Sequence, residues 1–193
     1  MPPLADTFYE IEDFTGLDCA GAELTDRTFR ECRFFDCDFS NCNLSRSQFS
    51  ECELKGCNVS NARLYDAKFS EVGFVDCKLT GLDFSTCNPL LFSINLARCR
   101  AAYCLFTGLN MACSNLSHSE LTDCIFEGTD LTKANFSSCD LRGTTFEKAS
   151  LDAADFRNAI NYLIDPLTNS LSKARFSYPE ALILLQPFGV IIE

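Results

Sequence analysis

The sequence predicts an all-β solenoid in which the chain turns a corner every five residues and closes a square coil after about four corners. Apolar residues, most of them Phe or Leu, recur at every fifth position from Leu24 to Phe84 and again from Leu96 to Phe156. A small residue, often Cys, Ser or Ala, stands two positions before most of them. A period of five fits neither the 3.6 residues of a helical turn nor the 2 of a strand. It therefore indicates a repeating turn with one large and one small inward side chain.

Length and composition restrict the class of protein. The 193 residues are 47% hydrophobic, which is typical of one folded domain or repeat array. A formal net charge of −11 argues against binding to nucleic acid or anionic lipid, because a phosphate backbone must be neutralised by cations. No apolar run approaches the roughly 18 residues of a membrane-spanning helix, and none of the 13 cysteines follows a secretory signal. We therefore expect a soluble cytoplasmic protein that binds neither membrane nor nucleic acid.

Individual five-residue segments follow one pattern: a small residue, a polar residue, Leu or Phe, and two further polar residues. Examples are CDFSN at 37–41, ANFSS at 134–138 and ADFRN at 154–158. The pattern resembles the pentapeptide-repeat family, and the resemblance implies a right-handed quadrilateral β-helix over residues 14–158. Residues twenty apart would then stack at about 4.8 Å, the spacing of hydrogen-bonded strands. The expected internal ladders are Phe29, Phe49 and Phe69, and Phe106, Phe126 and Phe146.

The chain divides into a lead-in (1–13), the repeat coil (14–158) and a C-terminal cap and dimerisation module (159–193). The register of the repeat changes once inside the coil. Phe84 and Leu96 are twelve residues apart, so two residues are inserted relative to a multiple of five, or seven if one corner is looped out.

The interruption at 86–95 is expected to form a bulge or a short protruding loop. Asn88 and Pro89 lie where a corner should fall, and proline removes a backbone donor from the ladder. The candidates for an exposed apolar tip, or for a wedge that seals the bulge, are Leu90, Leu91 and Phe92. A register change without a function is the alternative interpretation.

The repeat pattern gives way to a helical pattern near the C-terminus. In SYPEALILLQP, Ser177 is the expected N-cap, Glu180 its capping-box partner and Pro187 the stop of an α-helix over 178–186. A short strand is expected at 188–192. The apolar residues outnumber those that a cap needs: Ala181, Leu182, Leu184, Leu185, Phe188, Val190, Ile191 and Ile192. They predict a symmetric homodimer interface, and a monomeric cap over the last coil is the alternative.

Catalytic and metal-binding patterns are missing from the sequence. No two cysteines are separated by two residues, and most of them fall at the small inward position, where they would behave as small hydrophobic side chains. Cys113 and His118 are expected to point outward, without an evident nucleophile or base as partner. The sequence therefore predicts that the protein is not an enzyme and holds no metal or cofactor.

Acidic residues recur with the period of the coil. Glu31, Glu51 and Glu71 each lie two positions after a large inward Phe and are twenty apart, so we expect them to stack on one face of three successive coils. The next face is expected to carry Asp36 and Asp76, with Glu53 in the coil between them. The further candidates beyond the interruption are Asp123, Glu127 and Asp140.

These acidic rows have two interpretations. Like charges about 5 Å apart cost about 1 kcal/mol even in water, and nothing in the coil requires them. One interpretation is a surface that imitates the negative charge of DNA for a protein that normally binds DNA. The other is a solvated acidic face without a partner.

The stretch NYLIDPLTNSLSKARFSYPEALILL at 161–185 resembles the C-terminal module of the Qnr-type quinolone-resistance proteins, which are similar to the mycobacterial fluoroquinolone-resistance and albicidin-resistance proteins. This resemblance implies a C-terminal homodimer that mimics B-form DNA and binds DNA gyrase and topoisomerase IV. It also implies that such binding inhibits these enzymes or protects them from quinolones or a toxin. The interruption at 86–95 falls where some members carry a protruding loop. The alternative function is a structural scaffold whose partner is not a topoisomerase.

Overall fold

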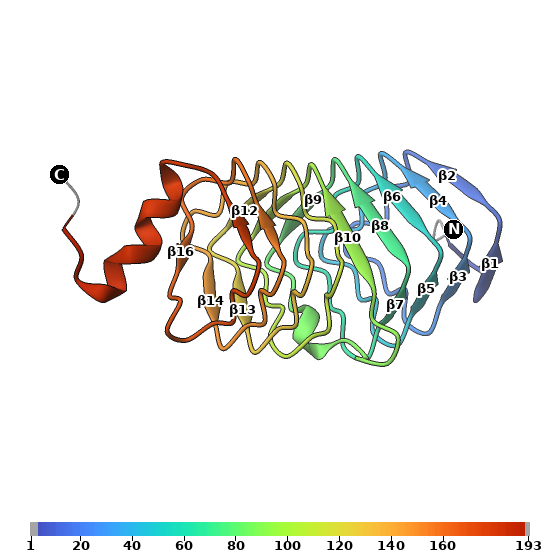
Figure 1. Ribbon diagram of the computed structural model, residues 1–193. Helices are drawn as coiled ribbons and strands as arrows, with labels where there is room; N and C mark the ends of the chain where they lie inside the picture. Colours follow the sequence, from blue (N-terminus) through green and yellow to red (C-terminus); the bar gives the residue numbers. More distant parts are fainter. Residues whose placement is uncertain (1–3, 192–193) are drawn as a thin grey trace.

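Short parallel strands wind into a solenoid. A computed structural model describes residues 4–191 of the chain. About eight coils follow one another from the N-terminal end to the C-terminal helix, in blue and red respectively in Figure 1. Strands of successive coils pair side by side, so each sheet runs along the length of the solenoid. This is the fold class that the five-residue period predicts.

The strands belong to five parallel sheets that form the walls of the coil. One contains β1 (Phe8–Glu10), β3 (Thr28–Arg30), β5 (Gln48–Ser50) and β7 (Lys68–Ser70). The next contains β2 (Asp13–Thr15), β4 (Arg33–Phe35), β6 (Glu53–Lys55), β8 (Val72–Val75) and β10 (Ile94–Ala97). The third contains β9 (Lys78–Thr80), β11 (Arg100–Ala102) and β12 (Glu120–Thr122). The last two contain β13 (Ile125–Glu127), β14 (Thr145–Glu147) and β16 (Leu163–Ile164), and β15 (Asp155–Phe156) and β17 (Arg175–Phe176).

Aromatic rings form continuous ladders inside the coil. Phe29, Phe49 and Phe69 are stacked, with successive ring centroids 4.8 and 5.3 Å apart. A second stacked ladder, with spacings of 4.7 and 5.2 Å, consists of Phe106, Phe126 and Phe146. Both predicted ladders are confirmed. Their burial stabilises the coil by about 25 cal/mol for each Å² of apolar surface removed from water.

The cysteines fill the small inward positions. Every cysteine that the structure describes is buried except Cys113. Most of the buried thiols donate a hydrogen bond to a backbone carbonyl of the neighbouring coil, as from Cys52 to Phe29 at 3.4 Å. Burial raises the pKa of the Cys139 thiol to about 12. Thiols in this environment pack as small hydrophobic groups and are poor nucleophiles.

Each regular corner is turned by one residue with positive φ, two positions after the large inward residue. Its N–H donates to a carbonyl of the next coil, as from Asp123 to Arg142 at 2.9 Å. Gly, Asn and Asp adopt this left-handed conformation most readily, whereas other side chains are strained in it. A corner residue other than Gly, Asn or Asp therefore carries a conformational cost that needs an explanation.

The register changes at the predicted place. β8 pairs Val72 with Ile94 in β10, a shift of 22 residues instead of 20, so two residues are inserted. A 3₁₀ turn, η1 (Phe84–Thr86), comes just before the insertion. The side chain of Asn88 then bridges two parts of the chain: its Nδ2 donates to Oδ1 of Asp66 at 2.9 Å, and its Oδ1 accepts from the N–H of Leu90 at 3.0 Å.

The inserted segment has an exposed tip and a buried wedge. Leu90 and Leu91 are 72% and 74% exposed. Phe92 is buried, and its ring meets those of Phe69 and Phe84 edge-on, with centroids 6.4 and 6.3 Å away. Leu90 and Leu91 therefore form the expected exposed apolar tip, and Phe92 forms the expected wedge.

The coil extends beyond both expected boundaries. Tyr9 in β1 stacks on Phe29 with ring centroids 5.3 Å apart, so the coil includes part of the expected lead-in. At the other end, β16 and β17 pair with β14 and β15, so another coil follows residue 158. In that coil β16 pairs with β14 at a shift of 18 residues, and Tyr162 fills a buried position. This irregular spacing hides the coil from the five-residue pattern.

The C-terminal helix departs from the expected α-helix. η2 (Glu180–Phe188) is a 3₁₀-helix and continues through Pro187, which was predicted to stop it. Ser177 was predicted to cap it, but its hydroxyl accepts a hydrogen bond from the N–H of Asn158 at 3.0 Å. Ser177 thus belongs to the last coil, and Pro179 at the N-cap position makes no side-chain cap. Pro187 has no N–H to donate, so η2 lacks one backbone hydrogen bond at this position.

Candidate protein-binding surface

Glu31, Glu51 and Glu71 lie in one row along the solenoid, directly after β3, β5 and β7. The prediction placed them on one face of three successive coils, and the structure places them at the same corner of those coils, with φ of 50°, 54° and 55°. The N–H of each of the first two donates to the next coil, from Glu31 to Ser50 and from Glu51 to Ser70 at 2.9 Å. The backbone is thus fixed while the carboxylates extend into solvent.

Glutamate is a poor choice for this backbone conformation. A side chain other than Gly, Asn or Asp at positive φ costs about 1 kcal/mol. The whole corner nevertheless lacks those three residue types, since its occupants are Ile11, Glu31, Glu51, Glu71, Cys113, Lys133, Ala153 and Lys173. No ion pair within residues 4–191 includes any of the three glutamates. Turn chemistry and local pairing therefore do not account for them.

The next corner carries Asp36, Gly56 and Asp76, twenty residues apart. A Cβ at Gly56 would collide with the carboxylate of Asp36, so the glycine leaves space for the aspartate of the preceding coil. Glu53 was expected between the two aspartates, but it lies in β6 between Arg33 and Gly73, three residues before that corner. The corner position between the aspartates thus belongs to Gly56.

Asp76 is neutralised by a neighbouring cation. Its two carboxylate oxygens accept hydrogen bonds from Nε and Nη2 of Arg98 at 2.8 and 3.1 Å. The hydrogen bond from this guanidinium lowers the pKa of the Asp76 carboxyl. Asp76 therefore contributes little net charge to an acidic surface.

The three candidates beyond the interruption lie elsewhere on the coil. Asp123 turns a third corner, and a Cβ on Gly143 would collide with its carboxylate. Glu127 lies in β13, 4.0 Å from Nζ of Lys148. Asp140 accepts from Nη2 of Arg142 at 3.1 Å. These residues do not join the glutamate row.

The structure thus brings together five of the predicted acidic residues along one wall and its two bordering corners. We call them the acidic surface: Glu31, Asp36, Glu51, Glu53 and Glu71. Its strands are β4, β6 and β8, and Figure 1 shows these strands side by side in the N-terminal half of the solenoid. In the same wall, Arg33 donates to both carboxylate oxygens of Asp13 at 2.6 and 2.7 Å, so this arginine is already paired.

Ladders of opposite charge between successive coils were not anticipated. Arg33 with Asp13 is one example, and Arg46 with Asp26 at 2.7 Å is another. In each pair the residues are twenty apart, so the sequence carried a signal that a search for opposite charges at this spacing would have found. None of the five residues of the acidic surface takes part in such an ion pair within residues 4–191.

The C-terminal segment both covers the last coil and exposes apolar side chains. Ile183 and Leu184 pack against the core. Of the residues predicted for dimerisation, Ala181, Leu182 and Leu184 are half-buried. Exposed apolar side chains then follow: Leu185, Phe188, Val190 and Ile191. Gly189 ends η2, so Val190 and Ile191 form no strand, and Ile192 lies outside the described residues.

No site for metal chemistry or membrane insertion occurs in the described part of the chain. Among residues 4–191, no group of three or more His, Cys, Asp or Glu side chains could hold a metal ion. In the same range, no helix is long and apolar enough to cross a membrane.

Two descriptions of the same repeat match most of the chain. Pentapeptide repeats (8 copies) match residues 32–70 and 47–88, and the Pentapeptide repeat region matches residues 88–156. No curated protein sequence matches the chain.

Solved structures share the fold at low sequence identity. QnrB1, described as a plasmid-mediated fluoroquinolone resistance protein, is 19% identical in one structure, with a TM-score of 0.73 over 96% of this chain and 89% of that chain. A second QnrB1 structure is 18% identical, with a TM-score of 0.69 over 96% and 91%. HetL from the cyanobacterium Nostoc sp., involved in heterocyst differentiation regulation, is 22% identical, with a TM-score of 0.52 over 88% and 86%. With its repeat sequence and its right-handed quadrilateral β-helix, this chain belongs to the pentapeptide-repeat family.

Proposed function

We propose that this protein is a DNA mimic that binds a type II topoisomerase, with DNA gyrase as the first partner and topoisomerase IV as the second. The observation behind the proposal is the acidic surface, whose glutamate row is unpaired and is held at strained corner positions. A surface that normally receives DNA would attract such a row electrostatically. The proposed outcome is inhibition of the enzyme, or its protection from quinolones or from a toxin that acts on it.

The dimensions and the charge are compatible with DNA mimicry. About eight coils spaced by about 4.8 Å give a rod about 38 Å long. Two chains joined end to end would span about 76 Å and carry twice the formal charge of −11. B-DNA of that length carries about 45 charges, at one per 1.7 Å. The dimer would thus have about half the charge density of DNA.

The likeness to QnrB1 supports a role connected with fluoroquinolones, because QnrB1 is a fluoroquinolone resistance protein with the same fold. HetL has the fold as well and is involved in the regulation of differentiation. A scaffold for a partner unrelated to topoisomerases is therefore the second function. The acidic surface favours the first, because a scaffold does not require rows of unpaired charge.

We further propose that the protein acts as a homodimer joined at its C-termini. The exposed segment from Leu185 to Ile191 supports this arrangement, because apolar side chains beyond those needed to cover the last coil remain open to solvent. An end-to-end dimer would also extend the acidic surface along one long axis.

Gyrase supercoiling in the presence of the purified protein tests the proposal. The triple variant Glu31→Gln, Glu51→Gln and Glu71→Gln removes the row's charge with little change in side-chain size. We expect it to raise the concentration needed for half-inhibition at least tenfold, about 1.4 kcal/mol of binding free energy. Inhibition by the unaltered protein should weaken with added salt, since exposed charges are screened.

A matched control removes three charges outside the acidic surface, through Glu23→Gln, Glu127→Gln and Glu147→Gln. It should inhibit like the unaltered protein. An equal loss of gyrase inhibition in the two triple variants would mean that net charge alone, and not the acidic surface, causes the inhibition. If the purified protein has no effect on supercoiling and none on the action of a quinolone or toxin on gyrase, the scaffold function is preferred.

A further inference from the structure

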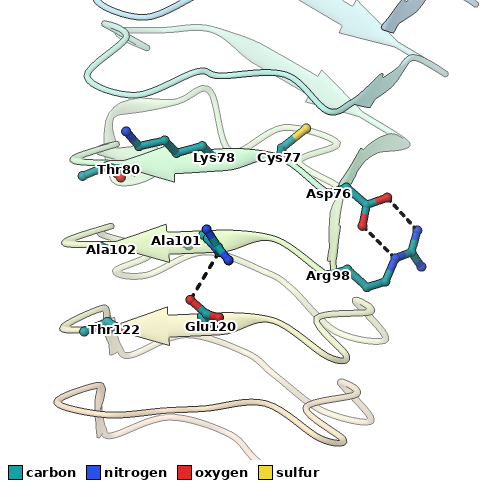
Figure 2. A pocket seen from close by; sticks show the side chains of 10 residues that line it. Asp76, Cys77, Lys78, Thr80, Arg98, Ala101, Ala102, Glu120 and Thr122 are labelled. Carbon is teal, nitrogen blue, oxygen red and sulfur yellow. Dashed lines mark hydrogen bonds and ion pairs between the residues drawn. The ribbon is translucent and has the colours of Figure 1, made fainter. Parts of the chain in front are cut away.

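A hollow on another wall of the coil has the opposite chemistry from the acidic surface. Its volume is about 600 Å³, and its lining comes from the parallel strands β9, β11 and β12 with the corner before β9. Figure 2 shows these strands one above another, with the lining side chains as sticks. The lining includes three cations in a protein with a strong negative charge: Lys78, Arg98 and Arg100.

Two of these cationic residues are cross-strand neighbours on adjacent strands. The register of β9 and β11 places Lys78 directly opposite Arg100. Like charges in this arrangement destabilise a sheet. The two-residue insertion creates the pairing, because residues 22 apart meet here instead of residues twenty apart. No ion pair within residues 4–191 includes Lys78.

The carboxylates of the hollow leave a positive charge between Lys78 and Arg100. Both oxygens of Asp76 are occupied by Arg98. Glu120 lies opposite Arg100 on its other side, and the contact from its Oε2 to Nε of Arg100 is 3.5 Å long between exposed groups. Such an exposed ion pair contributes little. An anion that binds between Lys78 and Arg100 would therefore compete with fewer carboxylates for these cations than it would elsewhere on this acidic protein.

Small polar side chains border the cations on the same strands. Thr80 and Thr122 line the hollow with Ala102 between them, and neither hydroxyl makes a hydrogen bond within the described residues. In Figure 2 Lys78 extends along β9 in the direction of Thr80. The wall thus offers an ammonium group, a guanidinium fork and hydroxyl donors above small side chains that leave space for a ligand.

We propose that this hollow binds a phosphate dianion, either free or as the phosphate group of a small metabolite. A dianion balances both neighbouring cations, whereas a carboxylate balances one. Its oxygens accept at the same time from the ammonium of Lys78, the planar fork of Arg100 and a threonine hydroxyl. The site is independent of topoisomerase binding, since it lies on a different sheet from β4, β6 and β8.

Titration with inorganic phosphate at constant ionic strength tests the site, followed by backbone amide NMR and by thermal unfolding. We expect saturable shifts at the amides of Lys78, Arg100 and Thr122, together with a rise in Tm relative to chloride. Glycerol phosphate is the second probe: tighter binding than inorganic phosphate assigns the site to a metabolite, and weaker binding assigns it to the free ion.

Lys78→Gln gives a signature that a purely structural lysine would not. Without phosphate the variant should have a higher Tm than the unaltered protein, because the repulsion with Arg100 is removed. With phosphate its gain in Tm should disappear, and its affinity should fall about tenfold or more. The matched control is Lys68→Gln, an exposed lysine at the equivalent strand position in β7, opposite Gln48. It should keep the full phosphate response.

Two results would overturn the proposal. One is the lack of a saturable response to either probe at millimolar concentration. The other is an equal loss of response in Lys78→Gln and Lys68→Gln, which would mean a general effect of net charge. Gyrase inhibition does not enter either readout, so this site and the proposed function can fail separately.

Discussion

Gly56 shows how a corner residue meets a side chain of the preceding coil. Its φ is 66°, and a Cβ there would collide with the carboxylate of Asp36 in the preceding coil. Gly21 has a similar φ of 68°, but nothing lies within 4 Å of the position of its Cβ. Alanine substitutions at Gly56 and Gly21 therefore separate the energetic cost of positive φ, which both share, from the cost of the collision, which only Gly56 has.

We expect Gly56→Ala to lower the free energy of unfolding by about 2 kcal/mol and Gly21→Ala by about 1 kcal/mol. Urea unfolding followed by circular dichroism measures both. Adding Asp36→Ala to Gly56→Ala should recover the difference, because the carboxylate is then gone. Equal losses in the two single variants would show that backbone strain alone sets the cost.

The candidate residues also show what a period reveals and what it omits. Spacing by twenty predicted the row of Glu31, Glu51 and Glu71, because stacking depends only on the length of a coil. The spacing did not reveal that these glutamates occupy a corner, because the backbone angle φ cannot be read from the spacing of residues. Nor did it reveal that Asp76 is paired, because Arg98 reaches it only after the two-residue insertion is placed.

At the scale of the element, the interruption is a structural wedge with an apolar tip. Phe92 fills the space between the rings of Phe69 and Phe84. Phe92→Ala should therefore lower the free energy of unfolding by about 3 kcal/mol, as expected for an aromatic ring lost from a core. Leu90→Ala should change it by less than about 0.5 kcal/mol, because Leu90 is exposed.

Thermal and urea unfolding of the two variants would measure this difference. If Leu90→Ala were as costly as Phe92→Ala, the tip would pack against the coil in solution. If neither variant lost stability, the interruption would be a register change whose stability does not depend on the buried ring of Phe92.

Regular elements were predictable from sequence and irregular ones were not. The five-residue period predicted the coil because each pentad makes the same turn and buries the same pair of side chains. In the last coil a shift of 18 residues and the buried Tyr162 obscure the period, although β16 and β17 still pair. The capping-box pattern failed for a related reason. The Ser177 hydroxyl accepts a hydrogen bond from Asn158 in the coil, so it does not cap the helix as the local sequence pattern predicted.

At the scale of the whole molecule, the C-terminal segment decides whether two solenoids form one rod. Ile183 faces the core, while Leu185 and Phe188 on the same helix are exposed. A charged residue at the exposed positions should therefore break a dimer without unfolding the chain. We expect the unaltered protein to have twice the 21.5 kDa chain mass in light scattering at micromolar concentration.

The double variant Leu185→Asp and Phe188→Asp should have the mass of one chain and a nearly unchanged Tm. Its acidic surface is intact, yet its inhibition of gyrase should fall at least tenfold, because half of the charged rod is lost and each half binds on its own. Leu91→Asp is the matched control: it adds an acid to an exposed leucine at the tip of the interruption, and it should remain dimeric. A monomeric variant that inhibits fully would mean that one solenoid is the active unit and that the exposed apolar segment serves another partner.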